Sequence, residues 1–354
     1  MSVYNFDGHK LMYHPARVAE FLADGDCFPL YIEISPAGSC NHRCIFCAYD
    51  YIGYPNRKLE TDRTLDFIDE LADCGVKSML FAGEGEPLLH PDIASFARRA
   101  DSRGIDVGLF TNGQLLHEEL AEQLLPSLTF VRFSFNGGGR ENYADIHAVR
   151  AEQYDRVVDN ITRAVALRRQ HGWKLDIGSQ FVVIPENIDR MLTAATTLKA
   201  CGVDYLAIKP FMQRDAQRYQ LTAQFSLGEI SERLSQAESL SDETFTVLAR
   251  RATFEAYGER SYDHCLGASF ITVLNSAGML ASCLPYWERE EFSFGSMYEQ
   301  SFRAIWRSER RRGIREYLQG RLDAHACPPN CRPHAINEFL WELSAPRARH
   351  INFI

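Results

Sequence analysis

The sequence has no long apolar segment and no basic, apolar N-terminus. No window approaches the roughly 20 apolar residues that a membrane-spanning helix needs. The first residues, MSVYNFDGHK, lack the features of a signal peptide. We therefore expect a cytoplasmic protein without a membrane partner, where structural disulfides are rare. The ten cysteines in 354 residues then favour metal binding or chemistry over disulfide bonding.

The chain also lacks an excess of positive charge. Its formal net charge is −9 at pH 7, whereas domains that bind nucleic acids carry a basic face, so we predict no nucleic-acid partner. Basic residues concentrate in residues 307–321, RSERRRGIREYLQGR. Their spacing favours a solvated helix face, with a patch for an anionic partner as the alternative.

Short β-rich runs alternate with helical patterns between residues 30 and 209. The predicted strands cover residues 30–35, 78–83, 106–111, 130–135, 175–183 and 204–209. Repeated β-α units imply parallel strands with right-handed crossovers, and six units are too few for a closed eight-stranded barrel. We predict an α/β fold with a partial (β/α)6 TIM-like barrel. The predicted parts are an N-terminal extension (1–28), the barrel (29–212), a helical connector (213–262) and a small C-terminal domain (263–354).

Polar residues share one face of several predicted strands, because successive side chains of a strand point to opposite sides. These residues are Glu33, Ser35, Arg132, Ser134, Asn136, Gln180, Tyr205 and Lys209. A packed barrel core would be lined by branched apolar side chains instead. The pattern therefore predicts a wet interior that holds a polar molecule.

Three cysteines, Cys40, Cys44 and Cys47, lie within eight residues in CNHRCIFC. The spacing would also place three small side chains on one face of a helix. The polar residues between them and the loop-like PAGS before them favour a ligand site instead. Thiolates select zinc or iron–sulfur clusters. Since a structural zinc site closes with four ligands, three protein ligands leave one coordination position for a reactant.

CNHRCIFC resembles the CxxxCxxC signature of radical S-adenosylmethionine (AdoMet) enzymes, with Phe46 at the aromatic position before the last cysteine. The resemblance implies a [4Fe–4S] cluster held by Cys40, Cys44 and Cys47, whose free iron binds AdoMet. In that family one electron cleaves AdoMet, and the 5′-deoxyadenosyl radical takes a hydrogen atom from the substrate. The protein orients this cofactor chemistry and excludes water. A flavodoxin- or ferredoxin-type reductant is implied as the partner.

A second motif, AGEGEP at residues 82–87, is similar to the GGEP motif of the same family. The resemblance implies that Gly83, Gly85 and Glu86 receive the methionine amino group of AdoMet. Glu84 stands where the first glycine is common in the family.

A third motif, FSFNG at residues 133–137, is similar to the family's SxDG. It implies that Ser134 and Asn136 lie near the ribose or carboxylate of AdoMet, with Asn136 replacing the commoner aspartate. His147 stands where many relatives place an arginine, so the resemblance leaves three alternatives for the partner of the AdoMet carboxylate: His147, Arg150 or neither of them.

A second set of cysteines lies in the last third of the chain. Cys265 and Cys283 flank a hairpin signal, and Cys327 and Cys331 follow in CPPNC. Four thiolates can close a four-ligand site. The region resembles the auxiliary-cluster region of the SPASM/twitch subgroup, which implies one auxiliary [4Fe–4S] cluster on these four cysteines. Structural zinc is the alternative.

An auxiliary cluster can accept an electron, which makes net two-electron oxidation possible. Twitch relatives include dehydrogenases that oxidise a carbinol of an aminocyclitol or sugar, and we predict this reaction on a small polar substrate. Arg132, Gln180 and Lys209 are the candidate catalytic residues. For Lys209, substrate contact or proton transfer competes with an ion pair to Glu33. The alternative functions are a radical epimerase or dehydratase, or a SPASM-type peptide-modifying enzyme.

Overall fold

The computed structural model of the protein describes residues 4, 8–214, 216–222, 225–287, 289–329, 331–346 and 348–353. Residues 1–3 and 5–7 of the predicted N-terminal extension, and the last residue of the predicted C-terminal domain, lie outside the described residues. Within these ranges, no helix combines the length and apolarity that crossing a membrane requires.

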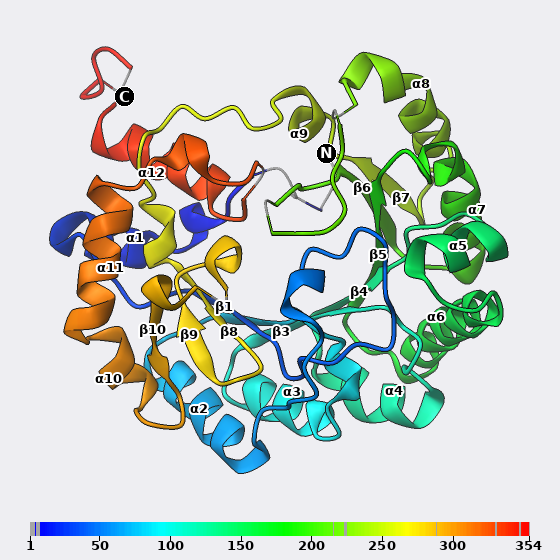
Figure 1. The fold of residues 1–354 in the computed structure, drawn as a ribbon, viewed down its shortest axis with the longest axis horizontal. Helices are drawn as coiled ribbons and strands as arrows, with labels where there is room; N and C mark the ends of the chain where they lie inside the picture. The colour runs from blue at the N-terminus through cyan, green and yellow to red at the C-terminus, as the bar shows by residue number, and fades with distance from the viewer. Residues whose placement is uncertain are drawn as a thin grey trace.

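A single curved sheet of ten strands organises the described residues, with helices on its outer side (Figure 1). The strand order is β10-β9-β8-β1-β2-β3-β4-β5-β6-β7. The strands are β1 (Tyr31–Ile34), β2 (Ser78–Phe81), β3 (Asp106–Thr111), β4 (Phe130–Ser134), β5 (Asp176–Val183), β6 (Tyr205–Pro210), β7 (Thr246–Ala249), β8 (Ile271–Leu274), β9 (Met279–Ala281) and β10 (Ser293–Ser296). Neighbours from β1 to β7 pair in parallel.

Amphipathic helices connect the parallel strands and cover their outer face (Figure 1). They are α2 (Thr61–Asp73), α3 (Ile93–Ser102), α4 (Glu118–Leu124), α5 (Arg140–His147), α6 (Glu152–His171), α7 (Met191–Cys201) and α8 (Leu227–Glu238). The remaining helices are α1 (Pro15–Asp24), α9 (Arg251–Glu255), α10 (Phe302–Trp306), α11 (Glu309–Gly320) and α12 (His334–Ser344). The predicted α/β fold with a partial barrel is confirmed, and all six predicted strands are present.

Two features of the sheet were not predicted. The segment expected to be a helical connector contains α8 and α9, but it also contributes β7, which pairs with β6. The predicted hairpin joins the barrel sheet directly, because β8 pairs in parallel with β1. Both pairings join residues far apart in the sequence, and a four-residue strand carries too little periodicity to reveal them.

The two faces of the barrel strands differ as predicted. On β4, Val131 and Phe133 are fully buried under the helices, whereas Arg132 and Ser134 remain partly exposed on the inner face. Gln180 on β5 also belongs to this partly exposed set. Of the other predicted inner-face residues, Lys209 is partly exposed, whereas Glu33, Ser35, Asn136 and Tyr205 are buried. The inner face is therefore polar, and part of it is exposed.

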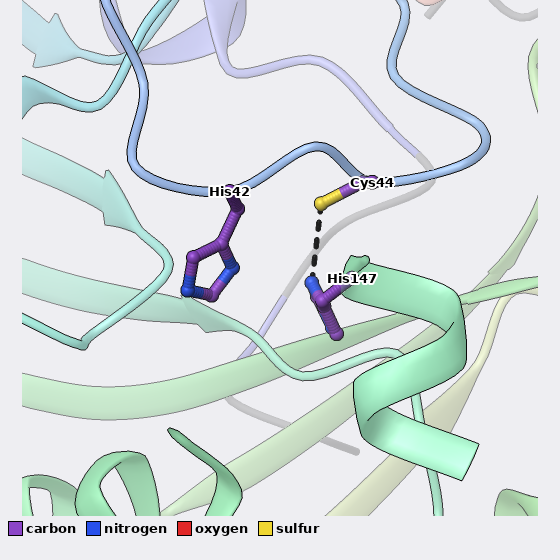
Figure 2. Close-up of side chains that lie close together, drawn as sticks. All are labelled: His42, Cys44 and His147. Carbon is purple, nitrogen blue, oxygen red and sulfur yellow. Dashed lines mark hydrogen bonds between the residues drawn. The ribbon is translucent and has the colours of Figure 1, made fainter. Parts of the chain in front are cut away.

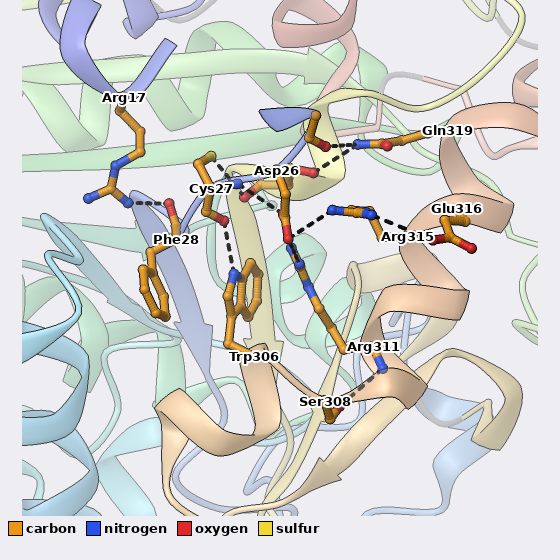
Figure 3. A network of polar contacts seen from close by, with 12 residues as sticks. Arg17, Asp26, Cys27, Phe28, Trp306, Ser308, Arg311, Arg315, Glu316 and Gln319 are labelled. Carbon is orange, nitrogen blue, oxygen red and sulfur yellow. Dashed lines mark hydrogen bonds and ion pairs between the residues drawn. The ribbon is translucent and has the colours of Figure 1, made fainter. Parts of the chain in front are cut away.

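The segment that leads into β1 is fixed by the C-terminal part of the chain (Figure 3). Arg311 of α11 is buried, pairs with Asp26 and lies 3.9 Å above the ring of Trp306. The Trp306 Nε1 group donates to the carbonyl of Cys27 at 2.9 Å. The prediction that the basic residues 307–321 form a solvated face is thus wrong for Arg311, because its guanidinium is buried in an ion pair with Asp26.

Candidate cluster and substrate site

The loop that carries Cys40, Cys44 and Cys47 leaves the C-terminal end of β1, where such folds place their active sites. Side chains of the loop after β3 hold it. Gln114 Oε1 accepts from Asn41 Nδ2 at 2.8 Å and lies 3.0 Å from His42 Nε2. The Asn112 amide donates to Asn41 Oδ1 at 2.6 Å. These hydrogen bonds of side-chain amides fix the loop that carries the three thiols.

The three thiols are free and half-buried, and Cys40 and Cys47 both act electrostatically on Cys44. Burial raises the pKa of Cys40 to about 12, with a further contribution from the charge of Glu86. Burial also raises the pKa of Cys44, and Cys47 and Cys40 add to the effect. Three neighbouring thiols that resist ionisation on their own are suited to a metal centre, whose charge would stabilise the thiolates. The donor set fits a [4Fe–4S] cluster with one iron left for a small molecule.

The glycines of the AGEGEP motif allow close packing against the cysteine loop. A Cβ on Gly85 would collide with the carbonyl oxygens of Ala37 and Ser39. Gly83 has a φ of +110°, and its Cβ would lie 2.7 Å from Ser35 Cβ. Both positions therefore require glycine, which places this motif directly beside the loop.

Glu86 is buried and binds three protein donors. Its carboxylate accepts from Thr111 Oγ1 at 2.6 Å, from the Asn112 N–H at 2.8 Å and from the Leu88 N–H at 3.1 Å. Burial raises its pKa, whereas these hydrogen bonds act in the opposite direction. A carboxylate offers about four acceptor positions, so Glu86 keeps room for one further donor. Its predicted contact to the methionine amino group stays a prediction.

The residues of the FSFNG motif differ in their exposure. Gln180 Nε2 donates to Ser134 Oγ at 3.3 Å on the inner face, and Gln180 Oε1 is buried without a partner among the described residues. Asn136 is buried, and its Oδ1 accepts from the Val182 N–H at 2.8 Å. Asn136 thus joins the ends of β4 and β5, so a role in AdoMet binding would rest on its remaining polar atoms.

His147 is fully buried behind the cysteine loop (Figure 2). Its predicted contact with the AdoMet carboxylate stays a prediction. Its Nδ1 lies 3.1 Å from Cys44 Sγ, and its Nε2 accepts from the Asn136 N–H at 3.2 Å. Burial, and then the charge of His42, lower the pKa of His147 far below the ordinary value. Protein groups therefore occupy both ring nitrogens. Arg150, the alternative, is exposed.

Phe46 lies beside Cys47 and is half-buried. Its ring meets Phe211 edge to face at a centroid distance of 6.3 Å, and its carbonyl accepts from Gln217 Nε2 at 3.0 Å. The segment that follows β6 thus covers the cysteine loop. The predicted contact of Phe46 with AdoMet stays a prediction.

The four cysteines of the C-terminal part come together in space. Burial raises the pKa of Cys283, and the charges of Cys265, Cys331 and Cys327 raise it further. Polar groups surround the thiols. Asn337 Nδ2 donates to Cys265 Sγ at 3.4 Å, and Tyr286 Oη lies 3.4 Å from Cys327 Sγ. Four free thiols with hydrogen-bonding neighbours suit a closed four-ligand centre, for which an auxiliary [4Fe–4S] cluster stays the predicted occupant.

Arg332, which the sequence did not indicate, links this second site to the barrel interior. It follows Cys331, and its guanidinium donates to Glu33 on β1 at 2.8 Å. The carboxylate of Glu33 thus has Arg332 as an ion-pair partner, while its charge also acts on Lys209, so the two alternatives for Lys209 stay predictions. Burial lowers the pKa of Lys209 to about 7, and Arg250, Arg132 and Arg332 contribute to the same shift.

Arg132 is the third candidate catalytic residue and lies on the floor of the inner face. Its Nε donates to Tyr205 Oη at 3.1 Å, and its guanidinium lies 4.9 Å above the ring of Phe110. A Cβ on Gly178 would collide with the ring of Tyr205, so glycine at this strand position lets that ring lie flat on the sheet. The arginine is thus held rigidly beneath the interior.

Glu84 is a second residue whose role the sequence did not show, although its departure from the family's glycine was a signal. Its buried carboxylate accepts from the Ser276 N–H at 2.8 Å, from Trp287 Nε1 at 3.1 Å and from Arg57. Ser276 and Trp287 belong to the C-terminal part. Glu84 therefore fastens the auxiliary region to the motif beside the first cysteine site.

Comparisons with known proteins agree with this geometry. The sequence pattern of the Radical SAM superfamily matches residues 34–198, and that of the SPASM iron-sulfur cluster-binding domain matches residues 265–333. The GTP 3′,8-cyclase of Chlorobaculum tepidum is 28% identical over 73% of this chain and 79% of its own length. The dTDP-4-amino-4,6-dideoxy-D-glucose ammonia-lyase of Streptomyces venezuelae is 28% identical over 48% of this chain and 36% of its own length.

A similar solved structure is that of Streptococcus suis SuiB bound to S-adenosylmethionine. It superposes with a TM-score of 0.65 at 16% identity, covering 87% of this chain and 72% of that chain, which shows a shared fold. Residues 34–198 therefore form a radical SAM domain, which implies AdoMet and a [4Fe–4S] cluster, and residues 265–333 form a SPASM domain, which implies an auxiliary iron–sulfur cluster.

Proposed function

We propose that this enzyme oxidises a carbinol of a small polar substrate, such as a sugar or an aminocyclitol, to a ketone. When bound, AdoMet and the cluster at Cys40, Cys44 and Cys47 supply a 5′-deoxyadenosyl radical, and the auxiliary cluster accepts one electron. The observation that carries the proposal is the set of partly exposed polar residues on the inner face of the barrel, Arg132, Gln180 and Lys209. The first cysteine loop follows β1, and Arg332 beside Cys331 binds Glu33 of the same strand. Two relatives are named for small polar substrates, GTP and a dTDP-linked amino sugar, which supports this class.

The proposed reaction is balanced in atoms and electrons. The substrate loses the hydrogen atom of its carbinol carbon, which becomes a methyl hydrogen of 5′-deoxyadenosine. It then loses its hydroxyl proton and one electron and becomes the ketone. The protein must therefore hold the hydroxyl group beside a proton acceptor and shield the radical from water.

Three inner-face residues are placed for these tasks. Gln180 Oε1 is a buried acceptor that can bind a substrate hydroxyl or ammonium group. Arg132 is held rigidly by Tyr205 and can donate to substrate oxygens. Lys209, whose pKa burial lowers to about 7, offers a neutral amine that can accept the hydroxyl proton. We assign substrate binding to Gln180 and Arg132, and proton transfer to Lys209.

The cofactor contacts complete the proposal. Phe46, Gly83, Gly85, Glu86 and Ser134 are assigned to AdoMet, and Cys265, Cys283, Cys327 and Cys331 to one auxiliary [4Fe–4S] cluster. A flavodoxin- or ferredoxin-type protein is the proposed reductant, and the cytoplasm is the proposed location.

The test is product analysis under anaerobic conditions. The reconstituted enzyme is incubated with AdoMet, dithionite and a panel of sugars and aminocyclitols deuterated at each carbinol carbon. We expect one substrate to give a ketone and deuterated 5′-deoxyadenosine in equal amounts. An epimer or a dehydrated product would contradict the dehydrogenase and favour those reactions. Deuterium-free 5′-deoxyadenosine with every compound would contradict the small-substrate proposal and favour a peptide substrate.

A further inference from the structure

His147 contacts one ligand of the first cysteine site directly. It is the last residue of α5, and its fully buried ring points at the middle cysteine of the loop (Figure 2). The distance between His147 Nδ1 and Cys44 Sγ is 3.1 Å. Within the described residues, the ligand atoms of His42, Cys44 and His147 lie within 4.8 Å of one another.

The hydrogen bonds around the ring decide which nitrogen carries the proton. The backbone N–H of Asn136 donates to His147 Nε2 at 3.2 Å, so Nε2 must be unprotonated. In the neutral ring the proton is then on Nδ1, which faces Cys44. His147 Nδ1 is therefore the donor and Cys44 Sγ the acceptor.

The position of this donor is fixed by the backbone. The N–H groups of Arg43 and Ile45 donate to the carbonyls of His147 and Ile146 at 3.1 and 3.0 Å. The ring of Tyr143 stacks on that of His147 at a centroid distance of 4.2 Å. The end of α5 and the residues on both sides of Cys44 are thus hydrogen-bonded to each other. This backbone pairing holds the His147 ring against the Cys44 sulfur.

A separate metal site on His42, Cys44 and His147 does not fit these bonds. Gln114 Oε1 accepts from Asn41 Nδ2, so it must also accept the proton of His42 Nε2. His42 then offers only Nδ1, which is buried and has no partner. Since His147 Nδ1 carries a proton, two ligand atoms remain, fewer than the three that a metal site needs.

We propose that His147 is a positioning residue that donates a hydrogen bond to the Cys44 thiolate and raises the reduction potential of the cluster held there. The inference rests on the proposed assignment of Cys44 as a cluster ligand. Reduction adds one electron and no proton, and the added negative charge spreads onto the cysteine sulfurs. A donor aimed at one sulfur stabilises the reduced state more than the oxidised state. His147 thereby makes the cluster easier to reduce.

The test compares His147→Leu with His147→Asn, two side chains of similar size of which only Asn can donate to Cys44. His90→Leu is the control, because His90 is a buried histidine that binds the Leu59 carbonyl at 2.8 Å instead of a cysteine. Reconstituted full-length proteins are reduced stepwise with dithionite. The signal followed is the electron paramagnetic resonance signal that changes when AdoMet is added, because it belongs to the first cluster.

We expect His147→Leu to lower the reduction equilibrium constant about tenfold, or about 59 mV for one electron, at unchanged iron content. His147→Asn should recover most of the loss, and His90→Leu should match the wild type. Equal potentials in wild type and His147→Leu, with iron and 5′-deoxyadenosine formation intact, would overturn this inference alone. A wild type without iron at Cys40, Cys44 and Cys47 would overturn the proposed function as well.

If His147→Leu does not fold, a measurement on the wild-type protein tests the hydrogen bond between His147 and Cys44. Protein labelled with 15N-histidine should show a nitrogen coupling to the reduced first cluster in pulsed electron paramagnetic resonance. The coupling should disappear in His147→Asn, which keeps His42. A wild-type spectrum without histidine coupling would overturn the inference.

Discussion

Cys40, Cys44 and Cys47 come from one loop, whereas the thiols of the second site come from separate segments of the C-terminal part: Cys265 before β8, Cys283 after β9, and Cys327 with Cys331 before α12. The first three cysteines lie close together in the sequence, and their loop is held by amide side chains from the loop after β3 and by His147 at the end of α5. The four-cysteine site forms only when the β8–β9 hairpin packs against the segment that leads into α12. In the proposed assignment, the three-cysteine site leaves a coordination position for a reactant, and the four-cysteine site is closed by its four ligands.

Two sets of contacts connect the parts of the chain that carry the two sites. Glu84, in the loop beside the first site, binds Ser276 and Trp287 of the C-terminal part. Arg332, beside the second site, reaches back to Glu33 on β1. The two centres are therefore tied to each other across the barrel interior, where we place the substrate.

Removing a ligand of the first site should have the largest effect. Cys44→Ala should abolish 5′-deoxyadenosine formation, because the cluster loses one of three protein ligands and AdoMet receives no electron. Chromatography of the anaerobic reaction measures this product. The control is Cys74→Ala, which removes a thiol from the core cluster of buried residues. Product formed by Cys44→Ala at the wild-type rate would refute the assignment.

Changes at the second site should separate the two half-reactions. Cys283→Ala should leave AdoMet cleavage measurable but stop ketone formation, since the substrate radical then has no electron acceptor. The iron content should fall from about eight to about four atoms per chain, as expected for the loss of one of two [4Fe–4S] clusters. Full ketone yield from this variant would show that the second centre is not the acceptor.

Lys209→Met should reduce ketone formation about 100-fold, within the range expected for the loss of a general base. Its pKa of about 7 sets the direction of the pH dependence. The amine accepts a proton only when it is neutral, so the wild-type rate should rise with pH up to about 7 and level off above it. The rate of Lys209→Met should stay flat over the same range. A wild-type rate that falls through this range would rule out Lys209 as the base.

Arg311→Met should have the smallest effect on chemistry and act on stability. The buried guanidinium pairs with Asp26 and covers Trp306, so its loss should lower the free energy of unfolding by about 2 kcal/mol. Urea unfolding of the anaerobic protein, followed by tryptophan fluorescence, measures the change. The neighbouring Arg312 is exposed, and Arg312→Met should be neutral. Equal losses in both variants would contradict a specific role for Arg311.

The sequence predicted the parts of the molecule that depend on local pattern. Strand alternation predicted the partly exposed Arg132 and Gln180, and the cysteine spacing predicted the first site. Pairings between distant segments were not predictable in this way. The joining of β8 to β1, the bond from Arg332 to Glu33 and the position of His147 behind Cys44 each depend on packing between elements far apart in the chain. Motif position alone did not indicate the contact between His147 and Cys44, because a shared position does not determine the direction of a side chain.

The most direct test of the account is the iron and acid-labile sulfide content of three anaerobically reconstituted proteins. These are the wild type, a variant with Cys40, Cys44 and Cys47 changed to Ala, and a variant with Cys265, Cys283, Cys327 and Cys331 changed to Ala. We predict about eight irons for the wild type and about four for each variant, as two [4Fe–4S] clusters require. Only the variant that keeps the first site should cleave AdoMet. A wild type with about four irons and bound zinc would contradict the two-cluster enzyme.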